Sequence, residues 1–492
     1  MKTANKLLLG IFLLVSLAAP RDARAADTTL KFKAKTTINK VEPTYPYSDA
    51  RPLPPISGVI GDDSNPTVAV TLPPWAIPFR TSMLQVTTSD ERVVPAANVT
   101  AMLVDPAQIA LAIIPVGVGY ARLLITLSDG THAEPFRLDY AASAMGRPGG
   151  HWHLGASDGS TAFAVDDKFM FIGDDEAQTL RLYRRDRSGL PIAQFDLNRY
   201  LALTDLHRNG KPKEIDIEAS LRVGARVYWL GSQSHDYAGQ SAVNRGRIFA
   251  TDLVGSGANT RLVFAGRYDY LTQDLIRWDT ANEHGRGRNC FGLAASLAPG
   301  VLSKAESGEG FAIEGLCASP DDPQAALVAF RAPLVLPEDR RLALVVPITN
   351  FLNLAVSQSA PGSARFGPPF EWNLGGRGIR AIDGTGTNYL IVAGPPSHTM
   401  TNRASAFRLF TWNGRPDSPP VERGADLTGL HPEGIVELPP LPWTNDSAVQ
   451  LVSDNGLTKY YGDGVSAKNL HTPAFKKCRS DWVKLGPAIS PP

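Results

Sequence analysis

A four-residue pattern recurs between residues 216 and 434 and decides the predicted fold. It reads Asp216-Ile217-Glu218-Ala219, then Ala312-Ile313-Glu314-Gly315, then Gly378-Ile379-Arg380-Ala381, and finally His431-Pro432-Glu433-Gly434. Each copy precedes an apolar segment of the kind that forms a buried strand. Two features that repeat in register predict stacked units of one kind.

The apolar segments extend the repeat to five units. They occupy residues 169–173, 227–231, 326–330, 389–394 and 449–452, and each leads into a short polar or turn-forming cluster. Each unit resembles a small antiparallel sheet that cannot cover both of its faces alone. Sheets arranged around an axis cover one another, so the sequence predicts an irregular β-propeller of five or more blades over residues 150–463. The alternative is two unrelated β-sandwiches.

The interval between the second and third apolar segments is longer than the others. It contains Leu271, Leu275 and Trp278 at helical offsets, which predicts a helical insertion. A sixth, poorly marked blade in this interval is the alternative. Residues 464–492 follow the last repeat and are predicted to be a C-terminal tail.

The region before the repeat carries several short β patterns. In one of them Ala121, Leu123, Ile125 and Leu127 alternate with other residues, a period typical of a half-buried strand. Asp129-Gly130 then provides a hairpin-type turn. Residues 27–145 are therefore predicted to form a β-sandwich, and segments 89–95, 116–119 and 127–130 resemble bacterial immunoglobulin-like and cadherin-like modules. The whole chain is thus predicted to be all-β.

The N-terminus has the order of features found in a secretory signal peptide. Lys2 and Lys6 precede an apolar run over residues 7–19, and Ala23-Arg24-Ala25 supplies a small-residue cleavage site. The sequence predicts cleavage after Ala25 and export to the periplasm or the exterior. An N-terminal anchor is the alternative, although the run is short for a bilayer span. We expect no membrane insertion of the mature chain.

Composition excludes several classes of protein. The chain has 492 residues with 49 Lys plus Arg against 48 Asp plus Glu, so no cationic excess points to nucleic acid. Its 44 glycines and 39 prolines suit a turn-rich β protein. The three cysteines, Cys290, Cys317 and Cys478, have no redox or zinc spacing, and the sequence leaves open whether two of them form a disulfide.

Four pieces of the repeat region resemble, in order, a family of uncharacterised exported bacterial proteins with a domain of unknown function. They are residues 311–316, 374–380, 389–394 and 431–435. The repeated Glu-Gly pieces are also similar to the esterase-like phytase propellers, another exported group. The first resemblance implies a propeller-like fold without an established activity, and the second implies a phosphoesterase.

A propeller brings equivalent positions of its innermost strands together at the axis. We therefore expect Glu218, Glu314, Arg380 and Glu433 to converge and bind a ligand there. Carboxylates at such a position repel one another unless a cation or Arg380 neutralises them. Oxygen ligands suit a hard ion such as Ca²⁺ or Mg²⁺. The candidate metal ligands are Asp216, Glu218, Glu314 and Glu433, and the alternative is a salt-bridged ring around Arg380 that has only a structural role.

The polar clusters after the apolar segments form a second candidate set on one rim of the propeller. The set comprises Asp174, Asp175, His235, Arg331, His398 and Asp454. His235 and His398 follow serine in matching contexts, and with Arg331 they could bind an anion or exchange protons. Ordinary turn chemistry is the alternative explanation for these residues.

The sequence therefore predicts an exported propeller whose axial polar site binds a small molecule or an envelope partner. One alternative is a metal-assisted hydrolase of the phosphoesterase or phytase-like class, with Ca²⁺ as its cofactor. Another is a structural envelope protein. The residues leave the ligand, the oligomeric state and the blade number open.

Overall fold

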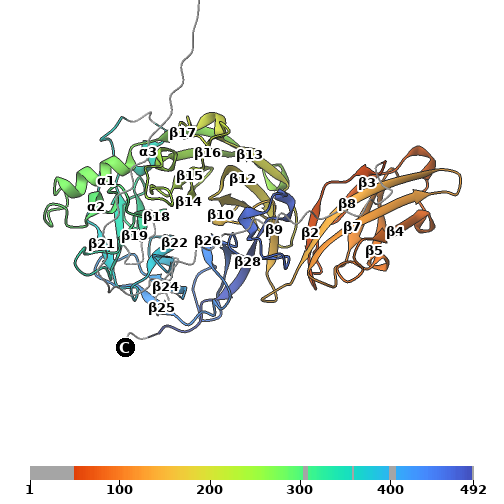
Figure 1. The fold of residues 1–492 in the computed structure, drawn as a ribbon. Coiled ribbons are helices and arrows are strands. Elements are labelled where there is room, and N and C mark those ends of the chain that lie inside the picture. Colours follow the sequence, from red (N-terminus) through yellow and green to blue (C-terminus); the bar gives the residue numbers. More distant parts are fainter. Residues whose placement is uncertain (1–48, 303–308, 357–359, 398–405, 490–492) are drawn as a thin grey trace, which may run out of the picture. The chain divides into compact units, whose positions relative to one another are not determined.

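The structure is a computed structural model, and it describes residues 49–302, 309–356, 360–397 and 406–489. The chain from residue 150 onward forms five four-stranded antiparallel sheets around a common centre (Figure 1). The first two sheets consist of β10 (Gly159–Ala164), β11 (Phe169–Asp174), β12 (Ala177–Arg184) and β13 (Ala193–Asp196), then β14 (Ile217–Val223), β15 (Arg226–Gly231), β16 (Ile248–Val254) and β17 (Arg261–Tyr268). The next two consist of β18 (Ala312–Ala318), β19 (Ala326–Ala332), β20 (Ala343–Ile348) and β21 (Phe370–Trp372), then β22 (Gly378–Thr385), β23 (Asn388–Gly394), β24 (Arg408–Trp412) and β25 (Val421–Arg423).

The fifth sheet closes the ring with strands from both ends of this region. It contains β26 (Pro432–Glu437), β27 (Ala448–Ser453), β28 (Lys477–Lys484) and β9 (His151–Leu154), in that order. Strand β9 pairs antiparallel with β28, with Lys477 opposite Leu154. The predicted tail after residue 463 is therefore wrong, because β28 is an integral strand of the last sheet.

The innermost strands follow one another around the axis. β10 contacts β14, β14 contacts β18, β18 contacts β22, β22 contacts β26, and β26 returns to β10. The fold is thus propeller-like with five sheets, and two separate sandwiches are excluded for this region. We call residues 150–489 the ring.

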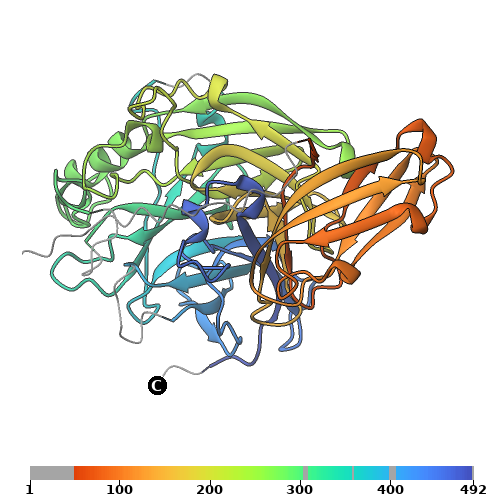
Figure 2. The same cartoon turned by 45° about the vertical axis from the view of Figure 1, so that its right-hand side comes forward.

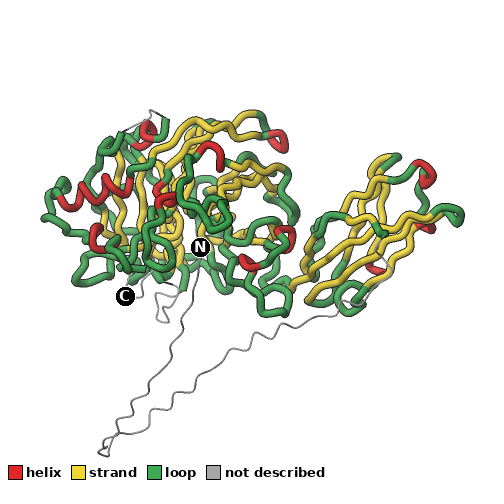
Figure 3. Tube along the Cα trace, turned by 45° about the horizontal axis from the view of Figure 1, so that its top comes forward, coloured by secondary structure: helices red, strands yellow, loops and turns green. Residues whose placement is uncertain are grey.

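The interval before β18 holds helices in place of a further sheet among the described residues. These are α1 (Leu271–Thr280) and α2 (Leu293–Ser296), and α1 buries Leu271, Leu275 and Trp278 against the neighbouring sheets. The predicted helical insertion is confirmed, and the described part of this interval contains no sixth blade. Among the described residues the remaining α-helix is α3 (Phe351–Leu354), and strands and loops make up most of the trace in Figure 3. No helix among the described residues is long and apolar enough to span a membrane.

Large apolar side chains fill the space between adjacent sheets. Phe163 of the first sheet packs near Trp229 of the second, and Trp229 stacks on Phe249 with ring centroids 6.1 Å apart. Between the third and fourth sheets, Trp372 and Trp412 lie 4.9 Å apart. Each sheet thus buries its faces against its neighbours, as stacked units require.

The chain before the ring forms two packed sheets, which we call the sandwich (Figure 2). One sheet contains β1 (Arg51–Pro52), β2 (Ile56–Val59), β4 (Leu84–Thr88), β7 (Gly119–Ser128) and β8 (Ala133–Ser143), and the other contains β3 (Val68–Thr71), β5 (Val99–Asp105) and β6 (Gln108–Ile113). The predicted alternation holds in β7, where Ala121, Leu123, Ile125 and Leu127 are buried. Short 3-10 helices lie at Pro74–Ala76, Thr81–Met83, Ala96–Asn98, Asn198–Tyr200, Val243–Gly246, Gly257–Asn259, Ala467–Asn469 and Pro473–Phe475.

The apolar core of the sandwich continues into the ring. Trp152, Tyr460, Tyr461 and Phe475 are buried in the same cluster as the sandwich residues.

The three cysteines are free thiols, and Cys317 and Cys478 are buried.

Candidate axial site

Every innermost strand carries a β-bulge at the same place. In β14, Ile217 pairs with Gly231 and Ala219 with Leu230, so Glu218 is the extra residue. The same interruption leaves out one residue in each of the other four innermost strands, namely Ser160, Glu314, Arg380 and Glu433. A bulge re-aims the side chain of its extra residue. The repeated pattern in the sequence is thus the mark of a repeated bulge at the axis.

The fifth member of this set, Ser160, does not belong to the repeated pattern seen in the sequence. Its uncharged side chain hides the repeat, although Asp158 stands two residues before it as Asp216 stands before Glu218. That shared aspartate is the signal that could have identified the first innermost strand.

The axial arginines and two of the glutamates form a buried network of ion pairs. Arg380 Nε lies 2.5 Å from Glu314 Oε2, and the Arg380 guanidinium also contacts Glu433. Arg331 Nη1 donates to Glu314 Oε1 at 2.9 Å. The exposed fractions are 3% for Arg380, 1% for Glu314 and 4% for Glu433. Burial, and to a lesser extent Arg331, lower the pKa of Arg380 below its usual value.

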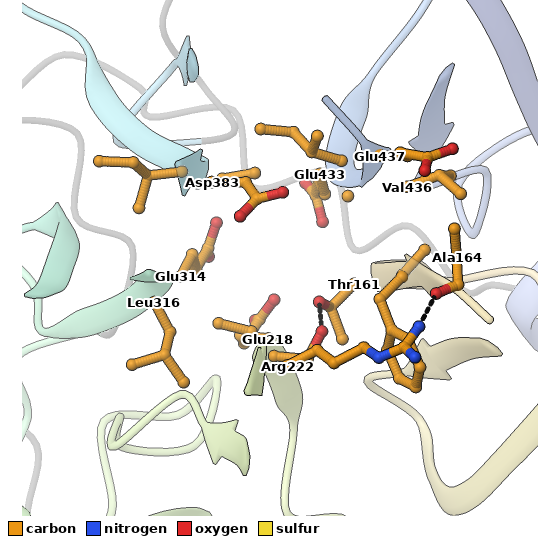
Figure 4. Close-up of a pocket in the computed structure, with 18 of the residues that line it drawn as sticks. Thr161, Ala164, Glu218, Arg222, Glu314, Leu316, Asp383, Glu433, Val436 and Glu437 are labelled. Carbon is orange, nitrogen blue, oxygen red and sulfur yellow. Dashed lines mark hydrogen bonds between the residues drawn. The ribbon is translucent and has the colours of Figure 1, made fainter. Parts of the chain in front are cut away.

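A cavity of about 250 Å³ opens beside this network (Figure 4). The carboxylates of Glu218, Glu314, Asp383 and Glu433 point toward the same space. On one wall, Thr161 Oγ1 and Ser220 Oγ are 2.8 Å apart. The cavity is therefore acidic and hydroxyl-lined.

Two further groups shape the electrostatics of this cavity. Burial raises the pKa of Asp383 to about 6, while the Gly384 amide that donates to its Oδ1 at 2.8 Å opposes the rise. Arg222 reaches across the wall and donates to the Ala164 carbonyl at 2.6 Å. Arg222 thus places one positive charge on the cavity wall, which carries several carboxylates.

A second group of carboxylates, which we call the acidic cluster, lies at the starts of β10 and β14, in the turn between β11 and β12, and just after β27. It comprises Asp158, Asp175, Glu176, Asp216, Glu218 and Asp454. Within it, Asp175, Asp216 and Glu218 each offer an oxygen within 4.8 Å of the others, and so do Asp158, Asp175 and Glu176. Glu218 also lines the cavity, so the cluster and the cavity meet at this residue.

Crowding and burial perturb the acidic cluster. Burial, with contributions from Asp158 and Glu218, raises the pKa of Asp175 well above its ordinary value. Burial, then Asp454 and Asp174, raise the pKa of Asp158 to about 8. Asp175 Oδ1 is buried and has no hydrogen-bond partner among the described residues. This arrangement disfavours charge unless a cation joins the carboxylates.

Few side-chain cations reach the acidic cluster. Arg245 Nη1 lies 2.9 Å from Asp216 Oδ2, but its Nη2 is engaged by Glu214 at 2.8 Å. Lys468 Nζ contacts Glu176 at 3.2 Å. Arg380 adds electrostatic attraction to Glu218 and Asp454, so in the described chain three cations serve six carboxylates.

The backbone around Asp158 is built to keep its carboxylate in place. A Cβ atom on Gly456 would lie 1.7 Å from Asp158 Oδ1, so a residue with a side chain cannot replace this glycine without moving the carboxylate. Ser157 Oγ donates to Asp158 Oδ2 at 2.5 Å. The backbone of Asp158 also forms a β-bridge with that of Asp454, which brings these two aspartates of the cluster side by side.

The structure redistributes the residues predicted for the site. Glu218, Glu314, Arg380 and Glu433 all come to the axis, and Arg331 joins them there instead of lying on the rim. The predicted metal set divides: Asp216 and Glu218 belong to the acidic cluster, whereas Glu314 and Glu433 are neutralised by arginines. Asp175 takes their place as the third carboxylate.

The predicted rim residues have separate fates. The His235 carbonyl accepts a hydrogen bond from Arg245 Nη1 at 2.9 Å. His235 is half-buried, and it does not belong to either group of carboxylates that could hold a metal ion. His398 lies outside the described residues. Asp174 is buried and caps the turn by accepting from the Glu176 amide at 3.1 Å, whereas Asp454 lies beside Asp158. The turn interpretation therefore holds for Asp174.

Comparison with known proteins gives no family for the chain. No family model and no curated protein matches it, so the resemblance to an uncharacterised exported family stays a prediction. Among solved structures, a phosphatase candidate from Bacteroides thetaiotaomicron aligns over 87% of this chain and 95% of its own, with 8% identity and a TM-score of 0.24.

Two other solved structures are similar at the same low level. A quinoprotein alcohol dehydrogenase-like protein from Bacteroides thetaiotaomicron aligns over 86% of this chain and 82% of its own, with 12% identity and a TM-score of 0.21. Domains 5–6 of the S-layer protein SbsC align over 43% of this chain and 78% of theirs, with 14% identity and a TM-score of 0.14. The function must therefore be argued from the axial residues themselves.

Proposed function

We propose that the chain is an exported binding protein whose acidic cluster holds a hard divalent cation, Ca²⁺ being the best fit. The observation that carries this proposal is Asp175, whose buried Oδ1 has no hydrogen-bond partner among the described residues. Its carboxylate belongs to both groups of oxygens that could hold an ion. Hard cations prefer carboxylate oxygens, and Ca²⁺ tolerates irregular sets of them.

The bound cation would give the axis its binding function. Glu218 belongs to the cluster and also lines the cavity, so an ion beside it would present positive charge to a ligand that enters there. Thr161 and Ser220 would offer hydroxyl groups to the same ligand. These features favour a small, oxygen-rich molecule or the anionic group of an envelope partner.

Calorimetric titration with CaCl₂ and unfolding in the presence of EDTA test the proposal. We expect wild-type protein to bind Ca²⁺ and to unfold at higher temperature with Ca²⁺ than with EDTA, because an ion bound only by the native state stabilises it. Asp175→Asn should abolish both effects. It should also stabilise the ion-free protein, since folding then no longer has to bury and protonate this crowded carboxyl group.

A matched control separates the acidic cluster from carboxylates elsewhere. Asp321→Asn changes an exposed aspartate at a turn between strands, and we expect it to bind Ca²⁺ as wild type does. Equal Ca²⁺ affinity in the Asp175 and Asp321 variants would overturn the proposal, as would the absence of any Ca²⁺ response in wild type.

A hydrolase of the phosphoesterase class is the second candidate. The observation that favours it is that Asp175 is shared by the two carboxylate groups, the arrangement of a carboxylate that bridges two ions. Two adjacent ions assist phosphoester cleavage by activating water and by stabilising the leaving oxygen. Ca²⁺-dependent release of phosphate from a phosphomonoester, lost in Asp175→Asn, would support this candidate, and binding of Ca²⁺ without release would exclude it for that substrate.

A structural envelope protein is the remaining reading. The arginines that neutralise Glu314 and Glu433 favour it, because they complete that network without any ion. The reading predicts no Ca²⁺ response in the titrations above. We further propose that the sandwich is immunoglobulin-like and that a signal peptide of residues 1–25 exports the chain, as the sequence indicates.

A further inference from the structure

A buried lysine lies where the sandwich meets the ring. Lys477 is in β28 of the ring and is 0% exposed, and its Nζ donates to the Gly58 carbonyl of the sandwich strand β2 at 3.0 Å. Its Nζ also lies over three aromatic side chains of residues 150–489, at 5.1 Å from the centroid of Tyr460, 5.3 Å from that of Tyr461 and 5.5 Å from that of Trp152. We call these three rings the aromatic box.

The environment suits a neutral amine better than a full ammonium. An ammonium has three N–H donors, and Gly58 O is the acceptor that the described residues give it. The ring faces attract a cation, but each typically contributes only about 0.5–2 kcal/mol. Transfer of a charged ammonium from water into a protein interior costs several kcal/mol even after relaxation.

The charged and titratable groups around Lys477 do not compensate that cost. Asp62 is the nearby carboxylate, and its Oδ2 already accepts from Ser188 Oγ at 2.5 Å. Arg479 lies over Trp152 and is paired with Asp481, and His153 on β9 is held neutral because burial lowers its pKa to about 3.

The neighbouring phenols are neutral as well. Burial raises the pKa values of Tyr140, Tyr460 and Tyr461. Burial lowers the pKa of Lys477 to about 7, and Asp62 opposes that fall. Among these groups, Lys477 is therefore the one that changes charge near neutral pH.

We propose that Lys477 makes the contact between the sandwich and the ring sensitive to pH. The uncharged amine keeps Gly58 seated against the aromatic box, and protonation loosens the contact. A second set of hydrogen bonds reports on the same contact, because the Ser188 amide of the ring donates to Ser64 Oγ of the sandwich at 3.0 Å.

The sign and size of the effect follow from proton linkage. In the open state the amine regains its ordinary pKa of 10.5, whereas in the closed state the pKa is about 7. The open state therefore binds more protons between these values, and acid favours opening. The opening equilibrium should rise about thirty-fold from pH 8.5 to pH 5.5 and should change little below pH 6.

Hydrogen exchange at the Ser188 amide tests the proposal on the full chain. After correction for the intrinsic exchange rate, wild type should lose about thirty-fold protection between pH 8.5 and 5.5. Lys477→Met, which keeps the length of the side chain without the charge, should show protection that does not depend on pH. Lys484→Met is the control, because Lys484 is an exposed lysine of the same strand that pairs with Asp446 at 2.8 Å, and it should behave as wild type.

Two results would overturn the proposal. One is protection in wild type that stays constant across this range, and the other is a Lys477→Met variant as pH-dependent as wild type. Should Lys477→Met fail to fold, nitrogen NMR of wild-type protein labelled at lysine decides the question. A Lys477 Nζ signal that titrates near pH 7 supports the proposal, and a titration above pH 9 contradicts it.

Discussion

Replacement of Arg380 by alanine tests whether the axial network holds the ring together. Arg380 pairs with Glu314 at 2.5 Å and with Glu433, and all three side chains are at most 5% exposed. In Arg380→Ala, Glu314 keeps its bond to Arg331, but Glu433 loses the ion pair that neutralises it. The variant therefore leaves one buried carboxylate without compensation.

The expected cost is large because the side chain of Glu433 is only 5% exposed, so water compensates little of its charge. Removal of one partner from a buried ion pair typically lowers the free energy of unfolding by about 3–5 kcal/mol. The matched control is Arg408→Ala, which removes a pair to Glu422 at 3.1 Å whose side chains are 40% and 29% exposed. An exposed pair contributes about 0–1 kcal/mol, so the control should lose no more than that.

Urea denaturation of wild type and both variants gives the comparison. We expect the double variant Arg380→Ala, Glu433→Gln to recover part of the lost stability, because it removes the uncompensated charge. Loss of less than about 1 kcal/mol in Arg380→Ala, equal to that in Arg408→Ala, would refute the reasoning, since it would mean that the carboxylates do not depend on Arg380.

Two further predictions rest on the structure and one rests on the sequence. Folding raises the pKa of Asp158 from 3.8 to about 8, so the stability that this group contributes is full below pH 4 and is lost as the pH rises through 8. The urea concentration at the unfolding midpoint, measured in EDTA, should therefore fall between pH 4 and pH 8. Asp158→Asn should remove the part of this fall that is due to Asp158. A ring fragment of residues 150–492 exposes Trp152, Tyr460 and Tyr461, so it should unfold at a lower urea concentration than the intact chain. Its stability should return when a fragment of residues 26–149 is added. Unfolding at the same urea concentration as the intact chain would show that the shared core contributes nothing to the stability of the ring. N-terminal sequencing of exported protein should begin at Ala26, and a product that begins at Met1 would exclude cleavage.

Charge at a recurring position made the axial strands predictable. A glutamate or arginine marks four of the five bulges, and the apolar segment that follows marks the next strand of each sheet. The first bulge holds Ser160, which carries no charge and could not be recognised as a member of the set. The closing strands β9 and β28 were also missed, because they come from opposite ends of the ring and share no local pattern.

The composition of the acidic cluster depends on tertiary geometry that the sequence does not display. The apolar segment before Arg331 predicts a position on the rim for this residue. However, β19 is buried along its whole length, so its sequence has no alternation from which the direction of the Arg331 side chain could be predicted. Asp175 follows β11 in a tight turn, where the same residue types serve turn formation. Only the folded ring shows that Asp175 meets Asp216 and Glu218 while Asp174 faces the turn.

Anomalous X-ray diffraction from crystals grown with Mn²⁺ in place of Ca²⁺ tests the central proposal most directly, because it locates a bound ion. We expect a peak among the oxygens of Asp175, Asp216 and Glu218 at coordination distances of about 2.0–2.6 Å, and no peak in crystals of Asp175→Asn. Absence of a peak at the acidic cluster in wild type, with Arg245 still paired to Asp216, would contradict the proposal that the axis of this ring binds a divalent cation.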